Sequence, residues 1–123
     1  MLVGIYTNST KDKADVLSTQ LISLLKQRGI DCEKTTKCFK QSFDIIVVVG
    51  GDGTVLDVVQ CAAEKDIPIL ALNAGKVGFL SAFESDELSS CVDFIVSGKF
   101  EFDKRPLISC KINDSEYFAL NEI

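Results

Sequence analysis

Residues 46–58 read Ile-Val-Val-Val-Gly-Gly-Asp-Gly-Thr-Val-Leu-Asp-Val. This stretch consists of an apolar run, a turn in which three glycines surround Asp52, and further apolar residues at helical spacing. The pattern predicts a strand, a tight turn and a helix. Backbone N–H groups at a helix N-terminus favour anions, so the turn is a candidate site for holding a phosphate beside an attacking hydroxyl.

Strands and helices alternate along the first hundred residues. Apolar runs predict strands, and apolar residues three or four positions apart predict helices. Gly29, Pro68 and Gly98 stand where helices are expected to stop. We expect strands at residues 2–6, 43–49 and 69–72, a short edge strand near Cys32, and helices at residues 11–28, about 54–65 and 85–98.

Two of these helices carry more detailed expectations. Ser85 is the expected N-cap of the third helix. The second helix is expected to bury Val55, Leu56, Val59, Ala62 and Ala63.

Beyond residue 104 the spacing of the apolar residues changes from that of helices to that of strands. Two strands, residues 107–112 and 116–120, are expected to form a hairpin around Asn113-Asp114-Ser115.

The order of elements predicts an α/β fold. We expect an open three-layer α/β domain with a parallel, Rossmann-like sheet over residues 1–103, followed over residues 104–123 by the first hairpin of a β-rich second domain. In such sheets ligands bind beyond the carboxyl ends of the strands. A second glycine-rich loop, Asn73-Ala74-Gly75-Lys76-Val77-Gly78-Phe79-Leu80, follows the next strand and is expected to face the same crevice.

Composition excludes several classes of function. The net charge is −5, with 18 acidic and 13 basic side chains, so we expect no nucleic-acid binding. The apolar runs are too short for a transmembrane helix, and we expect no membrane partner. There is no histidine, which excludes Ser-His and Cys-His catalysis within this chain. Five scattered cysteines predict free thiols in a reducing cytoplasm, where they would serve as small buried apolar residues.

Each candidate residue also has an ordinary structural interpretation. The first loop lacks the Lys-Ser/Thr of a Walker loop and the third glycine of a dinucleotide fingerprint, and Asp52 could simply cap the following helix. Asn73 could bind a ligand or cap a turn. Phe79 could lie in the core or support an adenine ring. Asn121-Glu122 could read ribose hydroxyls or base edges, but such residues are common at strand ends.

Together the three segments resemble the NAD kinase family, whose members use ATP to phosphorylate the adenosine ribose 2′-hydroxyl of NAD and so make NADP. Gly50-Gly51-Asp52-Gly53-Thr54 is similar to the family's GGDGT motif. Residues 73–80 resemble its NxGxxGFL segment, and Asn121-Glu122 resembles its Asn-Glu pair. Lipid kinases share the first motif but carry a different sequence in place of the second.

The resemblance implies a role for each matching residue. Asp52 would accept the proton of the 2′-hydroxyl, and Gly51 and Gly53 would bring backbone amides to the nucleotides. No residue is assigned as a metal ligand, although Mg²⁺ or another divalent metal would bridge the ATP phosphates. The remaining positions, which are Asn73, Phe79, Asn121 and Glu122, would bind the adenosine part of NAD.

The resemblance also implies the phosphoryl donor, the oligomeric state and the length of the full protein. ATP is the expected donor, polyphosphate is possible, and full-length members are expected to form homo-oligomers. Because members continue into a β-rich domain, we expect this chain to be a fragment with little activity alone. A lipid or sugar kinase of the same superfamily, and a nucleotide-binding module without catalysis, stay open as alternatives.

Overall fold

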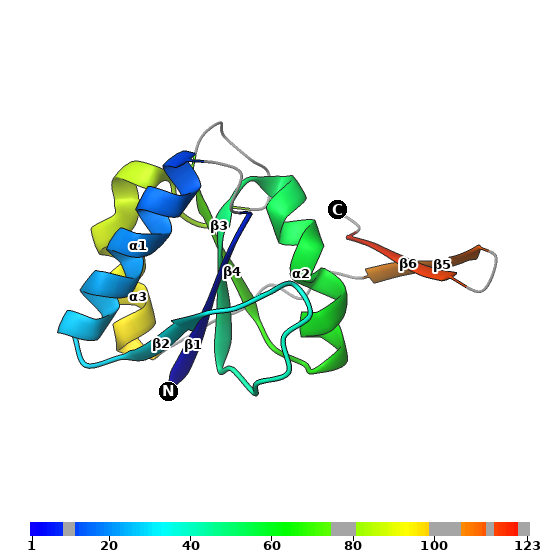
Figure 1. Ribbon diagram of the computed structural model, residues 1–123, viewed down its shortest axis with the longest axis horizontal. Coiled ribbons are helices and arrows are strands. Elements are labelled where there is room, and N and C mark those ends of the chain that lie inside the picture. Colours follow the sequence, from blue (N-terminus) through cyan, green and yellow to red (C-terminus); the bar gives the residue numbers. More distant parts are fainter. Residues whose placement is uncertain (9–11, 75–80, 99–106, 113–114, 121–123) are drawn as a thin grey trace.

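The computed structural model is a three-layer α/β domain with a small hairpin beside it (Figure 1). It describes residues 1–8, 12–74, 81–98, 107–112 and 115–120, the last two segments as backbone only. The central sheet has four parallel strands in the order β2-β1-β3-β4. Their bounds are β1 Leu2–Thr7, β2 Asp31–Lys34, β3 Ile45–Gly50 and β4 Ile69–Asn73.

Helices cover both faces of this sheet. α1 (Asp12–Gln27) and α3 (Leu88–Ser97) lie on one face, and α2 (Asp52–Glu64) lies on the other (Figure 1). A short 3₁₀ turn, η1 (Ser85–Glu87), leads into α3. The α/β fold with a parallel sheet that the sequence predicts is therefore confirmed.

The strand β3 explains why the sheet needs cover on both faces. Ile45, Val47 and Val49 pack in the core beneath α1 and α3. Ile46 and Val48 pack in the second core beneath α2. All five side chains are fully buried, as expected for a central strand of a parallel sheet, whose sequence is apolar without alternation.

The predicted hairpin is also present. β5 (Leu107–Ile112) and β6 (Ser115–Leu120) pair in antiparallel fashion, with Ile112 opposite Ser115. Ser115 thus belongs to the second strand, which corrects its placement in the turn, while Asn113 and Asp114 lie outside the described residues. The hairpin extends from the α2 side of the sheet (Figure 1). The domain boundary at residues 103 and 104 also lies outside the described segments and stays a prediction.

Three expectations about the second helix were wrong. α2 begins at Asp52, two residues before the predicted start, because the helical hydrogen bonds begin at the carbonyl of Gly51. Leu56 is 49% exposed and Ala63 is also exposed. The buried face of α2 contains fewer residues than the number of apolar residues in its sequence suggests. It consists of Val55, Val58, Val59 and Ala62.

The third helix differs at its start and agrees at its end. Glu84, not Ser85, is the N-cap of η1, where it forms a reciprocal capping box with Glu87. Its carboxylate reaches the backbone N–H of Glu87, which makes it an alternative to the short hydroxyl of serine. α3 ends as predicted at Gly98, which adopts a left-handed conformation with φ 65°.

The cysteines divide by burial. Four described cysteines are free thiols, and Cys32 and Cys91 are buried. Burial raises the pKa of the Cys91 thiol to about 12. The expectation that the cysteines are buried is wrong for Cys38, which is exposed because it lies in the irregular connection between β2 and β3, and Cys61 is only partly buried. Within the described segments, no helix combines the length and apolar character that crossing a membrane requires.

Candidate functional site

The candidate site lies at the carboxyl edge of the sheet, between β1 and β3. The chain leaves β1 through α1 on one face and leaves β3 through α2 on the other (Figure 1). The connections diverge there, which is the topological switch point of an open parallel sheet and the usual position of its ligand. Thr7 ends β1 and Gly50 ends β3 on either side of this point.

The glycine turn joins β3 directly to α2. Gly51 is the N-cap, and its carbonyl oxygen accepts hydrogen bonds from the N–H groups of Thr54, at 3.1 Å, and Val55, at 3.2 Å. The N–H of Gly53 therefore precedes the first helical donor and belongs to the end of the helix that attracts anions. No side chain caps this helix.

Asp52 is the first residue of α2 and is partly exposed. The interpretation of Asp52 as the helix cap is wrong, because the cap position belongs to Gly51. A carboxylate in the first helical turn lies at the end of the helix dipole that favours acidic side chains. The turn thus combines one carboxylate with backbone donors of glycine.

The start of the second loop lies against this turn. Asn73 ends β4 and is the register partner of Gly50. The N–H of the next residue, Ala74, donates to the carbonyl oxygen of Gly50 at 3.1 Å. The structure therefore brings the beginnings of both glycine-rich loops together, as the sequence predicts for neighbouring parallel strands.

The side chain of Asn73 is held inside the protein. Only 1% of Asn73 is exposed, and its Nδ2 donates a hydrogen bond of 2.8 Å to Oε2 of Glu84. Glu84 belongs to a segment that returns to β4 after the second loop. There the N–H of Asn73 donates to the carbonyl oxygen of Phe83 at 2.8 Å, and Phe83 forms a parallel bridge with Leu72.

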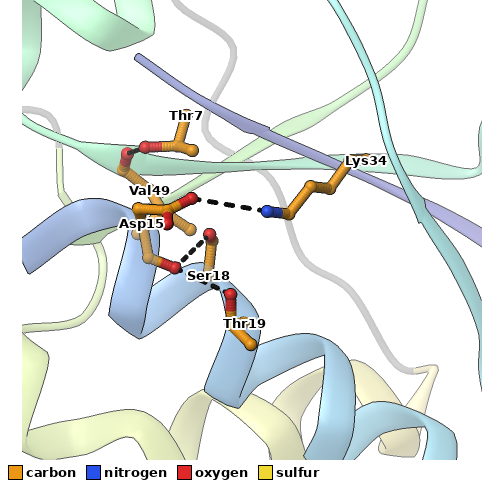
Figure 2. A network of polar contacts seen from close by, with 6 residues as sticks. All are labelled: Thr7, Asp15, Ser18, Thr19, Lys34 and Val49. Carbon is orange, nitrogen blue, oxygen red and sulfur yellow. Dashed lines mark hydrogen bonds and ion pairs between the residues drawn. The ribbon is translucent and has the colours of Figure 1, made fainter. Parts of the chain in front are cut away.

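A polar network lies on the other side of the switch point (Figure 2). The hydroxyl of Thr7 donates to the carbonyl oxygen of Val49 at 2.8 Å and so ties the ends of β1 and β3 together. Nζ of Lys34, at the end of β2, lies 3.4 Å from Oδ1 of Asp15 on α1. Both side chains are more than half exposed, so this ion pair contributes little to stability and can exchange partners.

These residues border an open cleft of about 630 Å³. The lysines in its wall can attract phosphate, while the aspartates and hydroxyls can bind hydroxyl groups. Among the described residues that line it, none belongs to the predicted site set. The lining residues are Ile5, Tyr6, Thr7, Asn8, Asp15, Lys34, Thr35, Thr36, Lys37 and Asp57.

Tyr6 links this cleft to α2. Its hydroxyl donates to Oδ2 of Asp57 at 2.9 Å. Burial, the hydrogen bond to Asp57 and the negative charge of that carboxylate together raise the pKa of Tyr6 to about 12. The phenol is therefore a fixed hydrogen-bond donor at neutral pH and is not suited to act as a general base.

The structure brings four of the predicted site residues together, namely Gly51, Asp52, Gly53 and Asn73. Phe79, Asn121 and Glu122 lie outside the described residues, so their roles stay predictions. Sequence reasoning missed Thr7, Tyr6, Lys34 and Glu84, which lie near the site. Each contacts a partner distant in the sequence. Only Thr7 carried a signal in the sequence, because it directly follows the strand predicted at residues 2–6.

A metal site built by the protein alone is not found in the described part of the chain. There, no three or more His, Cys, Asp or Glu side chains gather closely enough to hold an ion. The glycine turn supplies one carboxylate, that of Asp52. One carboxylate fits Mg²⁺ that is held mainly by substrate phosphates, which is the common arrangement for this ion.

The sheet, the glycine turn and the helix that begins there define an open α/β domain of the ligand-binding type. Residues 4–100 match the family model described as the ATP-NAD kinase N-terminal domain. The chain therefore belongs to the ATP-NAD kinase family.

Similar proteins agree with this assignment. The chain is 28% identical to the NAD kinase of Caldicellulosiruptor bescii over its whole length, which is 48% of that relative. It is 36% identical to the bifunctional NADP phosphatase/NAD kinase of Methanocaldococcus jannaschii, over 89% of this chain and 21% of that protein. The chain thus spans about half the length of several curated relatives, and less of the bifunctional one.

A solved structure supports the fold. The crystal structure of yeast NADH kinase complexed with NADH matches with a TM-score of 0.66, covering 98% of this chain and 45% of that one. Sequence identity in this match is 18%, so the likeness concerns the fold.

Proposed function

We propose that this chain is the part of an NAD kinase that carries the catalytic carboxylate. The reaction is transfer of the γ-phosphoryl group of ATP to the adenosine ribose 2′-hydroxyl of NAD, which gives NADP and ADP. Family membership supports the reaction class. The observation that carries the proposal is the register pairing of Gly50 with Asn73, which places the carboxylate turn beside the start of the second loop.

In this mechanism the hydroxyl oxygen bonds to the γ-phosphorus as the bond from phosphorus to the bridging oxygen of ADP breaks. Asp52 orients the hydroxyl and accepts its proton. Phosphoryl transfer through a loose transition state depends on positioning and charge neutralisation more than on a strong base. The carboxylate of Asp52, in the first turn of α2, meets that requirement.

Gly51 and Gly53 are assigned to the approach of the nucleotides. Apart from the adjacent backbone, a β-carbon built on either residue meets no atom of the described residues within 4 Å. Packing among the described residues therefore does not require glycine at these two positions, and glycine costs helix stability at position 53. A ligand close to the backbone gives a reason for both, since any side chain there would occupy its space.

The adenosine part of NAD is assigned to the second loop and the Asn-Glu pair. Asn73 is placed at the carboxyl edge beside the glycine turn, which supports its share in this pocket. Phe79, Asn121 and Glu122 are assigned by the resemblance alone. Mg²⁺, where bound, would neutralise phosphate charge. Asp52 is the acidic side chain of the glycine turn, and it would be able to approach the ion.

The biological setting is part of the same proposal. NAD and ATP are the substrates, and the full-length protein is a cytoplasmic homo-oligomer that binds neither nucleic acid nor membranes. The net charge of −5 supports the absence of nucleic-acid binding, and the free thiols of the described cysteines support a reducing compartment. The homo-oligomer is assigned by the resemblance alone. Because its relatives are about twice as long, we propose that this chain has little activity without the remaining part.

The test is an acceptor screen on the full-length protein encoded by the gene. The protein is supplied with ATP and Mg²⁺ and with NAD, a diacylglycerol or a sugar alcohol as the acceptor. We expect phosphorylation of NAD alone, detected as NADP. Phosphorylation of the lipid or sugar in its place would replace this proposal with the corresponding kinase, and no transfer to any acceptor would favour a binding module.

A further inference from the structure

The contact between Asn73 and Glu84 joins the end of β4 to a segment eleven residues further along the chain. Asn73 is almost fully buried, so its amide must be satisfied within the protein. In this contact the carboxylate oxygen of Glu84 is the acceptor, and an amide nitrogen is only a donor. The bond of 2.8 Å therefore fixes which end of the amide faces Glu84.

Glu84 itself is held in place by two further features. It forms the capping box with Glu87, in which the N–H of Glu84 donates to Oε1 of Glu87 at 3.0 Å. The preceding residue, Phe83, is hydrogen-bonded to β4 and packs its ring against that of Phe94 on α3, with centroids 5.9 Å apart. The carboxylate is thus fixed relative to both β4 and α3.

From these contacts we propose that Glu84 is a positioning residue, which orients the amide of Asn73 for the adenosine contact of NAD. The inference rests on the proposed function, in which Asn73 lines the adenosine pocket. Without the carboxylate, the amide loses a charge-assisted hydrogen bond that favours one of its two orientations. Glu84 then acts on nucleotide affinity through Asn73 and does not touch the reacting atoms.

The capping box offers a matched control. E84A removes both the cap and the acceptor for Asn73, whereas E87A weakens the same capping box and leaves the bond to Asn73 in place. E84Q keeps an oxygen that can accept from Asn73. These variants separate orientation of the amide from simple stabilisation of η1.

Steady-state kinetics of the full-length protein provide the first readout. We expect E84A to raise the KM for NAD about 10-fold, since a charge-assisted hydrogen bond is lost, with a smaller change in kcat. E84Q is expected to retain most of the affinity, and E87A to stay close to the parent protein. In the double variant N73A/E84A, the KM is expected to match that of N73A, because both changes remove one interaction.

Two kinetic results would overturn the proposal. One is an equal rise in KM for E87A and E84A, which would make the role of Glu84 purely structural. The other is independent, additive effects of N73A and E84A.

A second readout does not depend on turnover. The side-chain N–H groups of Asn73 are followed by NMR, and we expect their exchange with solvent to accelerate in E84A but not in E87A. Unchanged exchange in E84A would overturn the positioning role. A protein that makes no NADP but shows the expected exchange pattern would refute the proposed function while retaining the role of Glu84 in orienting Asn73.

Discussion

Gly50 and Thr54 approach so closely that a side chain at position 50 has no room. A β-carbon built on Gly50 would lie 2.5 Å from Oγ1 of Thr54 and 2.9 Å from its β-carbon. The chain can turn directly from β3 into α2 only because residue 50 is glycine. Gly50 is therefore required by the fold, whereas a β-carbon on Gly51 or Gly53 would contact none of the described side chains.

This difference predicts opposite effects for two similar substitutions. G50A is expected to destabilise the fold by roughly 1–3 kcal/mol, because Thr54 and the turn must shift. G53A is expected to leave stability unchanged or to raise it by up to about 1 kcal/mol, since alanine is the better helix former. Denaturant unfolding of the two variants measures both values.

The nucleotide affinity of the G53A variant tests whether Gly53 belongs to the proposed site. G53A is expected to weaken nucleotide binding in the full-length protein despite its intact fold, because its methyl group occupies the space assigned to the ligand. A stable G53A protein with unchanged affinity for NAD and ATP would remove Gly53 from the proposed site.

The titration of Tyr6 tests the link between β1 and α2. The pKa of Tyr6 is raised from its ordinary value of 10.0 to about 12, first by burial and then by Asp57. We expect D57A to lower this pKa without restoring the ordinary value, because burial remains. Ultraviolet titration of the phenol measures the change, and Y6F identifies its signal against that of Tyr117.

The raised pKa also predicts a pH dependence of stability. The folded protein keeps the Tyr6 proton at pH values where the unfolded chain has lost it, so folding is favoured by the protonated form. This contribution is fully present below about pH 10 and is lost as the pH rises toward about 12. In Y6F the corresponding loss over this alkaline range should be smaller, and an identical pH profile would contradict the account.

Two leucines test the assignment of the core. Leu21 on α1 is fully buried, whereas Leu56 on α2 is 49% exposed. L21A is expected to cost about 2–5 kcal/mol through lost burial and the cavity left behind. L56A is expected to change stability by less than about 0.5 kcal/mol. Equal losses in the two variants would contradict the packing described for α2.

Leu56 also shows where sequence reasoning reached its limit. The run Ile45 to Val49 predicts a central strand because five consecutive apolar residues need cover on both faces, and the structure confirms this. On α2, apolar residues outnumber the buried ones. Which of them faces the sheet depends on how α2 leaves Gly51, and the sequence alone did not predict that helix start.

The candidate site likewise contains residues that could be predicted from the sequence and residues that could not. The glycine turn and Asn73 follow predicted strands, so their meeting at one edge could be inferred from parallel pairing. Glu84 and Lys34 could not be inferred, because each contacts a partner from another element. Long-range contacts of this kind carry no periodic signal in a single sequence.

The most direct test of the central claim is the rate of NADP formation by the full-length protein carrying D52N. The account predicts a folded enzyme with kcat lowered by about 10²–10⁴-fold, because the group that orients the hydroxyl and accepts its proton is lost. E64Q, at the opposite end of α2, is the control and should retain the activity of the parent protein. A folded D52N enzyme with undiminished kcat would contradict the assignment of Asp52 as the catalytic carboxylate.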